Sequence, residues 1–126
     1  MVAEAKTWVD IENAIREWTR DSIPTVARRV FFSANTSVTE PQIVIQRIAG
    51  PDDACRIQFD VWSRTKADAA RIQGLLCTAI DALASYVFDG ILLHGAVVES
   101  VIWQPDPANN YPRYIIDATF VATPSS

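Results

Sequence analysis

Apolar residues recur at helical spacing near the start of the chain. Intervals of three and four residues separate Trp8, Ile11, Ile15 and Trp18. This spacing places all four on one face and predicts an amphipathic helix over about residues 7–20. Thr7, with Asp10 three residues later, resembles a capping box, and Pro24 prevents the helix from continuing beyond about residue 22.

A second and stronger helical pattern covers residues 65–87. Its apolar positions again recur at intervals of three and four: Ala69, Ile72, Leu76, Ala79, Ile80, Leu83 and Val87. This stripe is narrow and rich in alanine, which predicts close packing against a sheet. Thr65 and Asp68 supply a start signal, and Gly90 is expected to mark the stop.

Other segments have the period of two that is typical of strands. In residues 56–63, one face would carry Ile57, Phe59 and Val61 and the other Gln58, Asp60 and Trp62. The apolar run within residues 42–49 precedes the turn residues 50–53, so these two segments predict a β-hairpin.

Three further strands are expected, at residues 26–32, 92–103 and 113–122. In the last of them, Tyr114, Ile116, Ala118 and Phe120 alternate with Ile115, Asp117, Thr119 and Val121. The connection over residues 104–112 contains three prolines and the pair Asn109-Asn110, which excludes regular structure there.

This order of elements predicts one α+β domain over residues 1–126, with its core at about 7–122. Its sheet would be mixed or mainly antiparallel, with four to five strands and two helices packed on one face. The other face would carry Asp60, Trp62, Asp117 and Thr119. Such a face is too polar for a second core and too aromatic for plain solvent, which predicts a contact with a subunit or partner.

Composition and charge narrow the classes of function. With 49% hydrophobic residues in 126, the chain is expected to be globular, and a net charge of −4 with one tight basic cluster, Arg28-Arg29, disfavours sequence-specific DNA binding. The longest apolar run, residues 91–98, is too short to cross a membrane and is interrupted by His94 and Gly95. The first six residues lack the apolar segment of a secretion signal, so the cytoplasm is expected and both cysteines are expected to be reduced.

Residues for catalysis are scarce. His94 is the one histidine, so no helical pair of histidine ligands exists, and the four glycines do not form a phosphate-binding loop. We therefore predict no catalytic residue, no cofactor and no metal. Three acids, Asp60, Glu99 and Asp117, lie inside predicted strands, where a close pair could serve acid/base or metal chemistry. The favoured interpretation is that they face solvent, a lumen or arginines such as Arg47 and Arg56.

The aromatic residues favour an interface instead. Trp62 points away from the apolar face of its strand, and Trp103 stands where its strand enters the proline-rich connection. The candidate interface comprises Trp62, Trp103, Asp106, Tyr111 and Arg113, and Asp60 and Asp117 are candidates for an acidic lumen or sheet face.

Residues 57–69 combine an alternating strand that ends in Asp-Val-Trp, a Ser/Thr turn and the start of an alanine-rich helix. This segment resembles the tail terminator or tail completion proteins of long-tailed bacteriophages and prophages. The strand at 41–48 and the segment 111–120 agree with this likeness, which extends over about residues 8–122. No single motif carries it; the order of the elements and the total length do.

The resemblance implies a structural virion protein that assembles in the host cytoplasm as a ring, commonly a hexamer. Such a ring would sit on the head-proximal end of the tail tube, stop tube polymerisation and offer a surface for head-tail joining. Its partners would be further copies of itself, the tail tube protein and a head-tail connector protein, with DNA only as passing cargo and no membrane. The alternatives are a neck or head-completion connector on the portal side and, third, a small metal-dependent enzyme.

Overall fold

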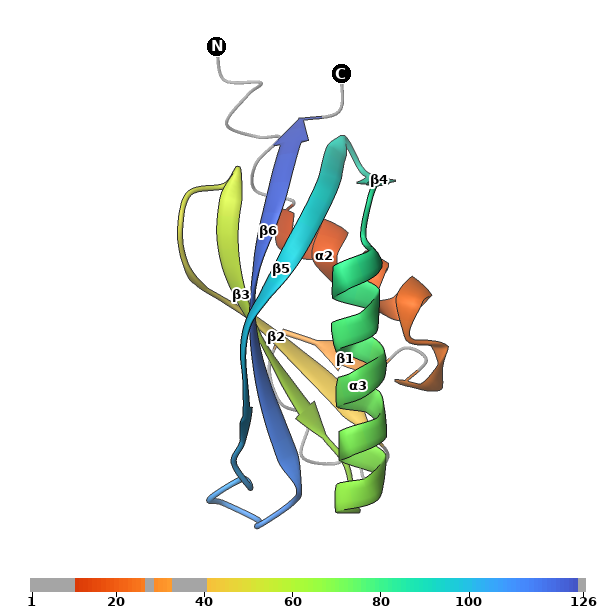
Figure 1. The fold of residues 1–126 in the computed structure, drawn as a ribbon, viewed down its shortest axis with the longest axis vertical. Helices are drawn as coiled ribbons and strands as arrows, with labels where there is room; N and C mark the ends of the chain where they lie inside the picture. The colour runs from red at the N-terminus through yellow and green to blue at the C-terminus, as the bar shows by residue number, and fades with distance from the viewer. Residues whose placement is uncertain (1–10, 27–28, 33–40, 125–126) are drawn as a thin grey trace.

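One six-stranded sheet with two helices on one of its faces makes up the described part of the chain (Figure 1). The computed structural model describes residues 11–26, 29–32 and 41–124. The helical elements are α2 (Ile11–Ser22), the 3-10 helix η1 (Pro24–Val26) and α3 (Lys66–Ala82). The strands are β1 (Val30–Phe31), β2 (Gln42–Ala49), β3 (Ala54–Trp62), β4 (Tyr86–Phe88), β5 (Ile91–Trp103) and β6 (Arg113–Pro124).

The strand order is β1-β2-β3-β6-β5-β4, and all neighbours are antiparallel except β1 and β2. The predicted α+β class, the mixed sheet and the helices on one face are therefore confirmed. The predicted four to five strands are too few, because β4 is a sixth. The hairpin of β2 and β3 lies where the sequence predicts it.

Aromatic and aliphatic side chains fill the space between the helices and the sheet. Phe59 of β3 and Phe120 of β6 are fully buried, with ring centroids 5.9 Å apart. Trp18 of α2 meets Phe120 edge-on at 5.5 Å. Leu76 of α3 belongs to the same buried cluster, so both helices share one core on one face of the sheet.

The first helix follows the predicted apolar spacing, and the first strand is shorter than predicted. Ile11, Ala14, Ile15 and Trp18 form the buried stripe of α2. Trp8 and the capping residues Thr7 and Asp10 lie outside the described residues. The strand expected over 26–32 is reduced to Val30–Phe31, because Pro24–Val26 forms a turn of 3-10 helix.

The prediction that the second helix continues to residue 87 is wrong. Thr65 does cap it, since its side chain accepts a hydrogen bond from the Asp68 amide, but α3 ends at Ala82. Val87 lies in β4, which forms a hairpin with β5. The turn between them uses the positive φ angles of Asp89 (50°) and Gly90 (83°), so Gly90 serves a hairpin and does not stop a helix.

Two neighbouring leucines test the packing of α3. Leu76 is fully buried, whereas Leu75 is 43% exposed. We expect Leu76→Ala to lower the free energy of unfolding by about 2 to 5 kcal/mol, because it removes buried atoms and leaves a cavity. Leu75→Ala is the matched control, with an expected loss below about 1 kcal/mol. Urea denaturation followed by circular dichroism measures both; equal losses would contradict the assigned helix face.

Two glycines with free space around them should respond to alanine in opposite directions. A Cβ atom would meet nothing within 4 Å at Gly74 or at Gly90, but Gly90 has a φ of +83°. Gly74→Ala in α3 should stabilise the protein by about 0.5 to 1 kcal/mol, because alanine is the better helix former. Gly90→Ala should cost about 1 to 2 kcal/mol, because an L side chain strains at positive φ. Thermal and urea unfolding of the two variants give the signs.

Candidate interaction surface

The sheet face opposite the helices is the candidate site, and we call it the open face. Cross-strand partners share a face, so the register of β3, β6 and β5 defines its members. It comprises Arg56, Gln58, Asp60, Trp62, Val97, Ser100, Ile102, Arg113, Ile115, Asp117, Thr119 and Val121. Both described helices pack on the other side (Figure 1).

Ion pairs between neighbouring strands line the centre of the open face. Arg113 Nη1 lies 3.3 Å from Asp60 Oδ2, and Arg56 Nη2 lies 3.6 Å from Asp117 Oδ2. The Gln58 side-chain amide also donates to Asp60 Oδ1 at 3.0 Å. Burial raises the pKa of Asp60, while Gln58 and Arg113 act in the opposite direction.

Asp60 and Asp117 thus occupy the sheet face on which the sequence places them. Each has an arginine beside it, so two acids and two bases balance along this row. In the described ranges, no three His, Cys, Asp or Glu side chains gather as metal ligands. Glu99 accepts a hydrogen bond from the Thr119 hydroxyl at 2.9 Å and joins neither aspartate.

Apolar side chains flank this charged row. Val97 and Ile102 of β5 are 61% and 49% exposed, and Val121 of β6 is 46% exposed. In the described sheet, β4 pairs only with residues 91–93 of β5, so the rest of that strand has no neighbour on its outer side. Exposed apolar groups beside an unpaired strand edge are typical of contacts between chains.

The expected exposure of Trp62 is wrong. Trp62 stands on the open face, opposite Gln42 and Arg113, yet it is only 7% exposed. It lies at the end of β3, where the 104–112 connection meets the strand and the Ser63 amide donates to the Pro112 carbonyl at 3.2 Å. Alternation predicts the face of a side chain but not whether other parts of the chain cover it.

Asp106 is also buried, at 7% exposure, and builds the 104–112 connection itself. Its carboxylate accepts the Ala108 amide at 2.7 Å, and its backbone bonds to Asn110 and Tyr111. Asp106 is therefore buried in the single chain, and its part in an interface stays a prediction.

The other candidate interface residues are exposed to different degrees. Trp103 is 39% exposed and packs against Tyr114 with ring centroids 5.1 Å apart. Lys66 Nζ lies 4.6 Å from the centroid of the Trp103 ring, which places this tryptophan on the helix-bearing side. Tyr111 is partly buried. The Arg113 side chain is only 13% exposed, and its guanidinium also donates to the Gln104 carbonyl at 3.1 Å.

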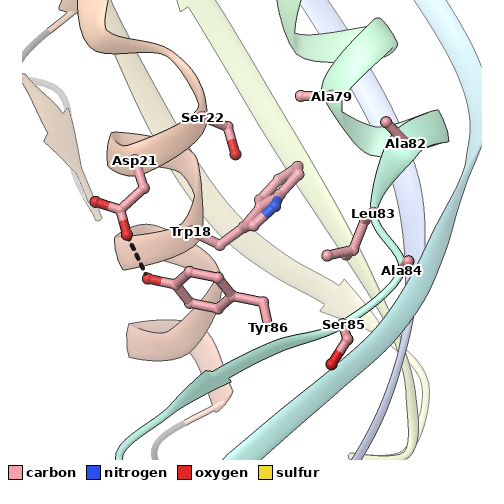
Figure 2. A pocket seen from close by; sticks show the side chains of 9 residues that line it. All are labelled: Trp18, Asp21, Ser22, Ala79, Ala82, Leu83, Ala84, Ser85 and Tyr86. Atoms are coloured by element: carbon pink, nitrogen blue, oxygen red, sulfur yellow. Dashed lines mark hydrogen bonds between the residues drawn. The ribbon is translucent and has the colours of Figure 1, made fainter.

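A separate cleft of about 400 Å³ lies between the ends of α2 and α3 and the start of β4 (Figure 2). Trp18, Asp21 and Tyr86 are among its lining residues, and the Tyr86 hydroxyl donates to Asp21 Oδ2 at 2.7 Å. The helical spacing of the sequence does not predict this cleft, because it extends the helix through residues 83–87. The Asp89-Gly90 pair between apolar runs is the signal that could have revealed the hairpin.

Comparisons with known proteins give a likeness in fold. No protein-family model matches the chain, and no curated protein matches it. A solved structure, "Structure of bacteriophage SPP1 gp17 protein", superposes with a TM-score of 0.57 at 17% identity, covering 94% of this chain and 93% of that one. The two proteins therefore share their fold over almost their full lengths. Neither described helix is long and apolar enough to cross a membrane.

Because Trp62 is buried, its removal is expected to lower the stability of the single chain. We expect Trp62→Ala to destabilise the single chain by about 3 to 5 kcal/mol, because a large buried ring is lost. Trp103→Ala, at 39% exposure, is the control and should cost clearly less. Urea unfolding at a concentration where the protein is monomeric measures both. An unfolding free energy unchanged by Trp62→Ala would show that this ring does not contribute to the core.

Proposed function

We propose that this chain is a structural protein of a phage virion that forms a ring, a hexamer, at the head-proximal end of the tail tube. There it ends tube polymerisation and provides the surface for head-tail joining. The sequence resemblance to tail terminator proteins supports this, as does the fold shared with a bacteriophage protein, gp17 of SPP1.

The open face is the observation that carries the proposal. A sheet packed on one side only, with Val97, Ile102 and Val121 between 46% and 61% exposed, has apolar area that a neighbour can cover. A ring covers such area by repeating one contact between copies, and the remaining exposed face is free for the tube protein and the connector protein.

The charge of the open face suits a channel that DNA passes through. Its arginines, Arg56 and Arg113, are each beside an aspartate, so neither is a free cation for a phosphate. DNA would therefore be passing cargo and not a bound ligand. In this proposal the protein has no enzymatic activity.

The alternative is that the protein acts on the portal side, as a neck or head-completion protein. The open face suits either location. Labelled protein bound to isolated tails supports the terminator role, whereas binding only to tail-less heads would support the alternative.

A substitution on α3 can serve as the control for one on the open face. Ile102→Lys introduces a charge on the open face, whereas Leu75→Lys on the exposed side of α3 is the matched control, with exposures of 49% and 43%. We expect Ile102→Lys to raise the concentration needed for ring formation, and for binding to tail tube ends, by about tenfold or more, which corresponds to at least about 1.4 kcal/mol. Leu75→Lys should leave both unchanged.

Light scattering after size exclusion and negative-stain images of tubes mixed with the protein measure these effects. A wild-type protein that stays monomeric alone and also fails to bind tube ends would overturn the proposal.

A further inference from the structure

The cleft of Figure 2 lies where two helices end. Asp21 and Ser22 belong to the last turn of α2, and Ala79 and Ala82 to the last turn of α3. The last carbonyls of a helix lack amide partners within it and carry partial negative charge. Two helix C-termini at one cleft therefore favour a cation.

No basic side chain of the described residues satisfies this preference. The last turn of α3 contains no base, and Arg20 in the last turn of α2 binds Glu17 at 2.8 Å. Asp21 adds a carboxylate whose one described partner is the neutral Tyr86 hydroxyl. Among the described residues, nine line the cleft, and they include Asp21 but no lysine or arginine.

The walls of the cleft fit a cation that has a hydrocarbon stem. Ala79, Ala82, Leu83 and Ala84 line one side, and the Trp18 ring points into the space between α2 and α3 (Figure 2). A volume of about 400 Å³ is at the small end of ligand sites. These features suit one lysine or arginine side chain, which packs its stem on apolar groups and holds its charge at the rim.

The chain itself carries an unpaired arginine. Arg64 is exposed in the turn between β3 and α3 and, among the described residues, makes no hydrogen bond, ion pair or ring contact. The other described lysine and arginine side chains have partners within the chain: Arg16, Arg20, Arg29, Arg47, Arg56, Lys66, Arg71 and Arg113.

Arg64 cannot reach the cleft of its own chain. It precedes the first residue of α3, while the cleft lies at the last turn of this 17-residue helix. At 1.5 Å per residue the helix separates the two by roughly 25 Å. A contact between Arg64 and the cleft therefore joins two copies, and because the two surfaces differ it is head-to-tail, the type of contact that closes a ring.

We infer that Arg64 of one copy inserts into the cleft of the next and places its guanidinium at Asp21 and the two helix ends. This inference rests on the proposed function, because it requires that copies associate. It adds a residue pair, Arg64 and Asp21, that would fix the orientation of each copy relative to the next in the ring.

Charge exchange tests the inference. Asp21→Arg places two arginines at the contact and Arg64→Asp places two aspartates there, so each change should raise the concentration for self-association by about tenfold or more. The double variant D21R/R64D restores opposite charges and should associate within about threefold of the wild type. Asp53→Arg, at an exposed acid in the β2–β3 turn, controls for the change in net charge and should have no effect.

Sedimentation velocity measures association, and circular dichroism melting checks that each variant is folded. Single variants that associate like the wild type overturn the inference and leave the ring intact. Single variants that fail without rescue in the folded double variant also overturn it. A wild-type protein that never associates, alone or on tube ends, overturns the proposed function and the inference with it.

Discussion

One-sided packing of the sheet is the constraint on which the rest of the structure depends. The buried rings of Phe59 and Phe120 point toward the helices, where Trp18 closes over Phe120. Because side chains alternate along a strand, burying these residues commits their neighbours to the opposite face. Asp60 and Val121 lie on that side for this reason, so the core and the interaction surface arise from the same alternation.

The spacing of apolar residues predicts correctly those helices and strands that have one apolar and one polar face. Ile57, Phe59 and Val61 repeat every second residue, and Ile72 and Leu76 repeat at helical spacing, so their faces follow directly. The period fails for residues 83–87, where Leu83 and Val87 continue the helical spacing although the chain turns into β4. There the positive φ angles of the Asp89-Gly90 turn and the pairing with β5 override the local pattern.

For the candidate site, the sequence predicts only the features that depend on one strand at a time. Alternation gives the face of Asp60 and Asp117, but the arginine beside each one depends on the register between β3 and β6. The burial of Asp106 depends on how the 104–112 connection folds, and the burial of Trp62 depends on packing beyond its own strand; no periodicity encodes either. The cleft forms where α2, α3 and β4 meet, so a pattern that does not indicate β4 cannot predict it.

Helix α3 has unfavourable as well as favourable charges at its ends. Arg64 and Lys66 lie at its N-terminus, where positive charge is disfavoured, although Asp68 in the first turn is favourable there. Asp81 lies in its last turn, where negative charge is disfavoured. In the proposed head-to-tail contact, Arg64 of a neighbouring copy would place a positive charge near the carbonyl end of this helix. Association would then offset the unfavourable placement of Asp81.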